Sequence, residues 1–96
     1  MAHLRISNEA EEDIDKITAH TTATWGWRQT DRYLAKLEDG FILLAKNPSI
    51  GRTADVLQVG LRRFEIGEHL VFYVAETGGV LIVRVLHERM MPGKYL

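Results

Sequence analysis

The chain has 96 residues, a formal net charge of −1 and 26% charged residues, which is typical of one soluble globular domain. The near-neutral net charge argues against a protein whose main function is to bind nucleic acid. There is no cysteine, so a disulfide framework and a Cys-ligated zinc site are both excluded. No apolar run approaches the roughly 20 residues that cross a bilayer, and the N-terminus lacks a signal-peptide core. We therefore expect a single domain over residues 1–96, cytoplasmic and without membrane association.

Two helices are predicted in the first half of the chain. Residues 4–6 are suited to an edge strand that precedes them. Ser7 or Asn8 is a suitable N-cap for the first helix, whose acidic opening turns complement the helix dipole. Gly26 is expected to end that helix and to link it directly to a second helix over residues 27–46.

The two helices are expected to pack as a hairpin with one buried stripe each. In the second helix Gly40 predicts a close approach to the neighbouring helix. The stripe of the first helix follows helical spacing and comprises Ala10, Ile14, Ile17, Thr21 and Trp25.

Residues 61–87 predict an antiparallel meander of three strands, because runs of β-branched and aromatic residues alternate with glycine-bearing turns. Gly67 and Glu68 suit a two-residue type II′ turn, and residues 76–79 form a looser turn. The element order is β-α-α-β-β-β. This order predicts an α+β fold of two layers, with the helical hairpin packed on one face of a small antiparallel sheet.

Side-chain alternation divides the meander into two faces, and we assign the drier one to the core beneath the helices. That face comprises Leu61, Arg63, Glu65, Leu70, Phe72, Val74, Leu81, Val83, Val85 and His87. The second face comprises Arg62, Phe64, Ile66, His69, Val71, Tyr73, Ala75, Val80, Ile82, Arg84 and Leu86. One helical hairpin covers only one face, so the apolar area of the second predicts a partner that covers it.

The pairing of the third strand depends on the length of the second loop. An even loop places Tyr73 near Ile82 and Val71 near Arg84, and an odd loop changes these partners.

No hydrolase, phosphate-loop or dinucleotide motif is present, and the four histidines lack zinc-site spacings. We therefore expect no catalytic residue, metal or cofactor. His87 is interpreted as a strand-end histidine that makes a backbone hydrogen bond. Arg62, Tyr73 and Arg84 share the second face, where they could bind phosphate or carboxylate or keep the sheet soluble. RNA cleavage needs an acid–base pair, and the only candidates, Tyr73 and His87, fall on opposite faces.

Several segments together resemble the ParE branch of the RelE/ParE toxins. They are residues 47–52 (NPSIGR), 60–63 (GLRR), 69–73 (HLVFY) and 82–90 (IVRVLHERM). The likeness covers nearly the whole chain and keeps the element order of the family. It implies the toxin of a type II toxin–antitoxin system that inhibits DNA gyrase, and so DNA replication, without being an enzyme. The alternatives are a RelE-like ribosome-dependent mRNA endonuclease and a non-toxic binding-module relative.

The resemblance also implies two protein partners and no sequence-specific nucleic-acid binding by the toxin alone. The first is a cognate antitoxin, whose C-terminal segment wraps the toxin. Its expected binding surface is Arg62, Phe64, Ile66, Val71, Tyr73, Ile82, Arg84 and Leu86. The second is DNA gyrase, and its expected contact is Arg63, His87, Arg89, Met90, Met91, Lys94 and Tyr95.

Overall fold

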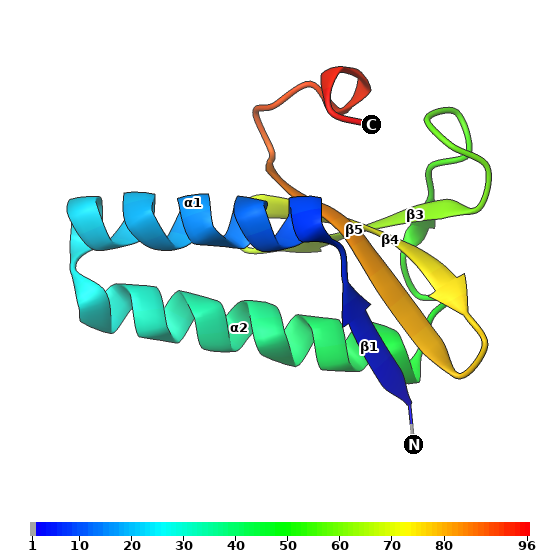
Figure 1. Ribbon diagram of the computed structural model, residues 1–96, viewed down its shortest axis with the longest axis horizontal. Coiled ribbons are helices and arrows are strands. Elements are labelled where there is room, and N and C mark those ends of the chain that lie inside the picture. The colour runs from blue at the N-terminus through cyan, green and yellow to red at the C-terminus, as the bar shows by residue number, and fades with distance from the viewer. Residues whose placement is uncertain (1) are drawn as a thin grey trace.

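The computed structural model describes residues 2–96, which form a helical hairpin packed on a five-stranded sheet (Figure 1). The helices are α1 (Asn8–Trp25) and α2 (Trp27–Lys46), and a 3-10 helix, η1 (Pro92–Lys94), lies near the C-terminus. The strands are β1 (His3–Ile6), β2 (Arg52–Thr53), β3 (Leu61–Ile66), β4 (His69–Glu76) and β5 (Gly79–His87), in the spatial order β1-β5-β4-β3-β2. The predicted α+β architecture is confirmed. The sheet is mixed rather than antiparallel, because β1 runs parallel to β5.

Both ends of α1 form where the sequence predicts them. Ser7, not Asn8, is the N-cap, and its hydroxyl accepts a hydrogen bond from the Ala10 N–H at 3.0 Å. The same hydroxyl donates to the Val83 carbonyl oxygen at 2.7 Å, which ties the start of α1 to the sheet. Gly26 ends the helix with a φ of +87°, a conformation that favours glycine.

The glycine in the middle of α2 faces the sheet rather than the other helix. A Cβ atom at Gly40 would overlap the side chain of Ile66 on β3. The close approach predicted from Gly40 therefore exists, but its predicted partner, the first helix, is wrong.

The predicted assignment of the two sheet faces is also wrong, because the helices cover the second face. The residues of β3–β5 that pack against the helices are Ile66, Val71, Tyr73, Val80, Ile82 and Val85, with Phe64 partly buried beside them. Tyr73 can lie in this core because its hydroxyl donates to the Pro48 carbonyl and accepts from the Gly51 N–H, both at 2.8 Å. The hydroxyl of Tyr73 is polar and would oppose burial on its own, but inside the core it has both a hydrogen-bond acceptor and a hydrogen-bond donor.

A β-bulge separates the two halves of the β4–β5 ladder. Phe72 pairs with Arg84, whereas the next residue, Tyr73, pairs with Ile82, so Val83 is the extra residue on β5. The two-residue turn before β5 confirms the pairing predicted between Tyr73 and Ile82.

Beyond the bulge, the partners differ from the predicted ones by one residue. Val71 lies opposite Val85, not opposite Arg84. The same shift places His69 directly opposite His87, although the sequence assigned them to different faces. The bulge is therefore the feature that assembles the histidine pair described below.

The face of the sheet turned away from the helices is covered by the chain itself. Its buried residues, hereafter the outer cluster, are Leu61, Leu70, Phe72 and Leu86. Ala54 from the loop before β3 packs on this cluster, as do Met90 and Leu96 from the segment after β5. The predicted need for a partner to cover this much apolar area is therefore wrong. In Figure 1 the C-terminal segment leaves the end of β5 and finishes in the short helix drawn in red at the top of the view.

No helix within residues 2–96 is long and apolar enough to cross a membrane.

Candidate binding pocket between the helical hairpin and the β3–β4 turn

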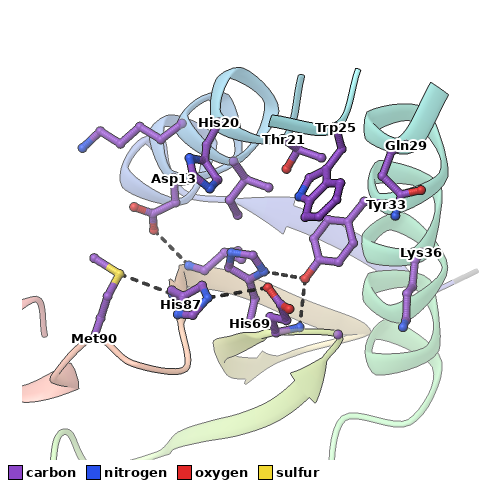
Figure 2. Close-up of a pocket in the computed structure, with 15 residues that line it drawn as sticks. Asp13, His20, Thr21, Trp25, Gln29, Tyr33, Lys36, His69, His87 and Met90 are labelled. Atoms are coloured by element: carbon purple, nitrogen blue, oxygen red, sulfur yellow. Dashed lines mark hydrogen bonds and ion pairs between the residues drawn. The ribbon is translucent and has the colours of Figure 1, made fainter. Parts of the chain in front are cut away.

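A pocket of about 790 Å³ opens where the helical hairpin overhangs the β3–β4 turn and the end of β5 (Figure 2). Its walls come from all of these elements, so distant parts of the sequence meet there. The lining residues include Lys16, His20 and Trp25 from α1, Tyr33 and Lys36 from α2, and Glu68, His69, His87 and Met90 from the sheet side. Figure 2 shows Tyr33 reaching down from α2 toward His69, with His87 beside His69.

Tyr33 fixes the β3–β4 turn to α2. Its hydroxyl donates to the Ile66 carbonyl at 3.2 Å and accepts from the Glu68 N–H at 3.1 Å. The third partner of this hydroxyl is Nδ1 of His69, at short hydrogen-bond range. Gly67 has a φ of +59° and a Cβ there would lie 2.6 Å from the Tyr33 hydroxyl, so both conformation and space require glycine. The turn is thus rigidly placed below α2.

His87 extends this cluster toward the C-terminal segment. Its Nδ1 accepts a hydrogen bond from the Arg89 N–H at 3.1 Å, which confirms the backbone bond predicted for this residue. Nε2 of the same ring lies 3.7 Å from Oε2 of Glu68. The rings of His69 and His87 meet edge to face, with centroids 5.4 Å apart.

Burial keeps the inner part of the cluster uncharged. Burial lowers the pKa of His69 below its ordinary value of 6.5, and the neighbouring His87 lowers it further. Burial likewise raises the pKa of Tyr33 above 10.0. The floor of the pocket therefore presents neutral, hydrogen-bonding rings at neutral pH.

The lowered pKa of His69 makes the free energy of unfolding depend on pH. As the pH falls through about 6.5, His69 takes up a proton in the unfolded chain but stays neutral in the folded one. The unfolded state then binds more protons, so we expect the free energy of unfolding to decrease as the solution is acidified. Urea titrations at about pH 7.5 and about pH 5.5 measure this decrease, above the range where carboxylates titrate.

Two variants separate His69 from the other histidines. The His69→Asn variant keeps a polar atom near Tyr33 and should lose part of the pH dependence. The matched variant His20→Asn changes an exposed histidine and should keep the wild-type dependence. Equal pH slopes for His69→Asn and the wild type would refute the assignment to His69.

A buried ion pair holds α1 against β5 beside the pocket. Asp13 is 6% exposed, and its carboxylate accepts from Nε and Nη2 of Arg84 at 2.8 and 2.7 Å. It also accepts from the Val85 N–H at 2.9 Å, so the carboxylate is fully paired. The hydrogen bond with Asp13 raises the pKa of Arg84 above its ordinary value. Arg84 thus has a structural partner within the chain.

Comparison with known proteins decides the family. The family model described as "ParE toxin of type II toxin-antitoxin system, parDE" matches residues 4–92. The chain belongs to the ParE toxin family. Toxin ParE1 of Mycobacterium tuberculosis (strain H37Rv) is 37% identical over 86 residues, which is 88% of each chain. Toxin ParE of Escherichia coli is also 37% identical over 86 residues, covering 88% of this chain and 84% of that protein.

A solved structure shares the fold of this ParE-family toxin. A chain of the "Chromosomal ParDE TA system from P. aeruginosa" superposes with a TM-score of 0.77, covering 91% of this chain and 96% of that one. The sequence identity is 16%, so this likeness concerns the fold alone.

The structure does not arrange the predicted antitoxin-binding residues of the toxin as an open surface. The buried ones are Ile66, Val71, Tyr73, Ile82 and Leu86. Arg84 is paired with Asp13, and Arg62 donates to the Gly51 carbonyl at 2.7 Å. Phe64 is half-buried. The premise that these residues face solvent is therefore wrong. The helices cover Ile66, Val71, Tyr73 and Ile82, whereas Leu86 is buried in the outer cluster on the other face.

The residues predicted to contact gyrase fall into three places. Arg89, Met91, Lys94 and Tyr95 are exposed together on the segment after β5, whereas Met90 is half-buried against the outer cluster. Arg63 lies on β3, opposite Arg52 of β2. His87 turns toward the pocket instead.

Sequence reasoning missed most of the pocket. No local spacing links Tyr33, Trp25 and His69, so the sequence indicates only two helix residues and an ordinary strand start. Trp25 was predicted to be buried but is 72% exposed. Within residues 2–96 no group of three or more His, Cys, Asp or Glu residues could hold a metal ion.

Proposed function

We propose that this ParE-family toxin inhibits DNA gyrase and so blocks DNA replication, and that a cognate antitoxin neutralises it. Family membership carries the proposal, since the family model matches residues 4–92 and the curated relatives cover nearly the whole chain. The related P. aeruginosa structure belongs to a ParDE toxin–antitoxin system, which supports an antitoxin partner for this chain as well.

The burial of the Tyr73 side chain favours a binding function over RNA cleavage. Its side chain is fully buried, and its hydroxyl already bonds to the Pro48 carbonyl and the Gly51 N–H. This hydroxyl is therefore not available to move a proton on a substrate. Inhibition by binding needs no such group.

The segment after β5 is the best-supported contact for gyrase. It is held in place because Nη1 of Arg84 donates to the Tyr95 carbonyl at 3.0 Å, with the guanidinium 5.5 Å from the Tyr95 ring centre. Arg89 and Lys94 then project as exposed cations from a fixed segment. A fixed, cationic and partly aromatic surface suits a protein target.

Growth and incorporation measurements test the proposal. On induction of the toxin, DNA synthesis, measured as thymidine incorporation, should fall before protein synthesis, measured as leucine incorporation. The double variant Arg89→Glu/Lys94→Glu should lose the growth arrest, because it reverses the two exposed charges of the proposed gyrase contact. Both side chains are exposed, so the variant should keep the fold.

The matched control is Lys46→Glu, which reverses an exposed charge at the end of α2. This variant should arrest growth as the wild type does. An earlier fall in protein synthesis than in DNA synthesis would contradict gyrase as the target. Full arrest by the Arg89→Glu/Lys94→Glu variant would remove the C-terminal segment as the contact.

A further inference from the structure

Arg52 and Arg63 form a pair of like charges at one edge of the sheet. They lie directly opposite each other on β2 and β3, so both side chains point to the same face. Like charges at directly opposite positions destabilise a sheet. Neither arginine forms an ion pair with another residue between positions 2 and 96. The pair therefore lowers the stability of the fold, and no ion pair in that part of the chain offsets the loss.

The other arginines of the sheet provide an internal comparison, because each has a partner within the toxin. A glutamate pairs with Arg5 on β1, and an aspartate pairs with Arg84 on β5. Arg62, the neighbour of Arg63, donates to two backbone carbonyls. The guanidiniums of Arg52 and Arg63 thus differ from the rest in having no acidic partner in the described chain.

A cleft of about 230 Å³ lies at this edge of the sheet. Its lining consists of the two arginines with Ile50, Phe64 and Glu65. This volume has room for a phosphate group together with a few water molecules. Guanidinium groups bind oxyanions through paired, planar N–H donors, and in this lining two of them outnumber one carboxylate. The cleft therefore has the charge and the donors of an oxyanion site.

The arginine pair lies on the same face of the toxin as the proposed gyrase contact. Arg63 is directly opposite Phe72 of the outer cluster. Met90 and Leu96, from the segment after β5, pack on that same cluster. A toxin that binds gyrase through this segment therefore also turns the arginine pair toward the complex of gyrase with its DNA.

Charge is distributed unevenly between the two layers of the toxin. α1 and α2 carry eight acidic and five basic residues, although the whole chain carries 13 and 12. The helical layer is thus net negative, and the remainder, mainly the sheet and the segment after β5, is net positive. A polyanion is attracted to the sheet side of the toxin and repelled by the helices.

We infer that Arg52 and Arg63 bind a phosphate of the DNA backbone while the toxin is bound to gyrase. The choice of DNA as the source of the phosphate rests on the proposed function. DNA is favoured over an acidic protein surface because every stretch of its backbone presents a phosphate, which two guanidiniums can bind from any register. Such a contact reads no base sequence, in agreement with the expectation that the toxin alone binds no specific sequence.

Anisotropy of a fluorescently labelled DNA duplex, titrated with the full-length toxin at about 50 mM salt, tests the site. Arg52→Gln/Arg63→Gln should raise Kd by about tenfold or more, as loss of charge-assisted hydrogen bonds does. The slope of log Kd against log salt concentration should fall by about one or more, because each neutralised phosphate contributes about 0.9. A purely structural role for the pair would leave this slope unchanged.

The matched control is Arg28→Gln/Arg32→Gln, which removes the same charge from two exposed residues of α2. It should change Kd for the duplex by less than about threefold. Arg52→Gln/Arg63→Gln should keep or raise the thermal midpoint, because it removes the repulsion between opposite positions of the sheet. Arg52→Gln alone changes only an exposed residue and repeats the measurement if the double variant is less stable.

Measurements with gyrase separate a DNA contact from a protein contact. Arg52→Gln/Arg63→Gln should require about tenfold more toxin to halve supercoiling, because inhibition involves the enzyme with its DNA. The same variant should bind DNA-free gyrase with the wild-type Kd in calorimetry. Weaker binding to DNA-free gyrase would assign the pair to an acidic protein surface and overturn DNA as the ligand.

The remaining outcomes separate this inference from the proposed function. Equal losses of duplex binding in the Arg52→Gln/Arg63→Gln and Arg28→Gln/Arg32→Gln variants, or no duplex binding by the wild type, overturn the phosphate site. Complete displacement of the duplex by inorganic phosphate at equal ionic strength would assign the pair to a free anion and overturn DNA. Pair-dependent duplex binding by a toxin that leaves supercoiling unaffected would overturn gyrase inhibition and leave the phosphate site standing.

Discussion

Replacement of Asp13 by alanine should lower the free energy of unfolding by about 3 kcal/mol or more, the range seen when one partner of a buried ion pair is removed. The Asp13 and Arg84 side chains are only 7% and 17% exposed. Without the carboxylate, the mostly buried guanidinium of Arg84 loses its counter-charge and keeps only the Tyr95 carbonyl as a partner, and the Val85 N–H loses its acceptor. Alanine itself favours the helix, so the loss comes from the missing pair.

Urea unfolding measures this loss, and Asp15→Ala is the matched control on the same helix. Asp15 is exposed, so its replacement should change the free energy of unfolding by less than about 0.5 kcal/mol. Comparable stabilities of the Asp13→Ala and Asp15→Ala variants would show that the pair contributes nothing to the fold.

The same ion pair determines what replacement of Arg84 by alanine would measure. The family resemblance includes Arg84 in the expected antitoxin surface, whereas the structure pairs it with Asp13 and with the Tyr95 carbonyl. Arg84→Ala should therefore destabilise the toxin and loosen its C-terminal segment even without a partner. In a double-mutant cycle, Asp13→Ala/Arg84→Ala should cost less than the sum of the single losses, because neither charge is then left alone.

Replacement of Phe72 by alanine should cost about 3–5 kcal/mol, as for other fully buried phenylalanines. Phe72 has no exposed surface although it lies on the face turned away from the helices. The expected loss follows only if the chain keeps that face covered, with Met90 and Leu96 packed on the outer cluster.

The control for this variant is Val56→Ala, which truncates a fully exposed aliphatic residue in the loop before β3. It should leave the unfolding midpoint unchanged. A loss below about 1 kcal/mol for Phe72→Ala would mean that the outer cluster is open to water, and that a partner covers it after all.

The helices and strands could be predicted because their signals are local. The cap at Ser7, the break at Gly26 and the turn at Gly67 each act within a few residues. The faces of the sheet could not be predicted, because both are similarly apolar. Their orientation depends on Tyr73, whose hydroxyl finds its partners in the loop after α2.

The pocket depends on features that act over long distances in the sequence. His69 and His87 face each other only because one extra residue, Val83, shifts the β4–β5 ladder. Asp13 looked like a solvated residue of an acidic helix start, since its partner is 71 positions away. Contacts between residues far apart in the sequence produce no periodic pattern, so they could not be predicted. The family could be predicted, because the resemblance to the ParE branch identified it.

Supercoiling by purified DNA gyrase tests the proposed function most directly. With relaxed plasmid and ATP, we expect the toxin to stop supercoiling, and we expect prior mixing with the antitoxin to restore it. Complete supercoiling in a large molar excess of folded toxin would contradict gyrase inhibition as the activity of this protein.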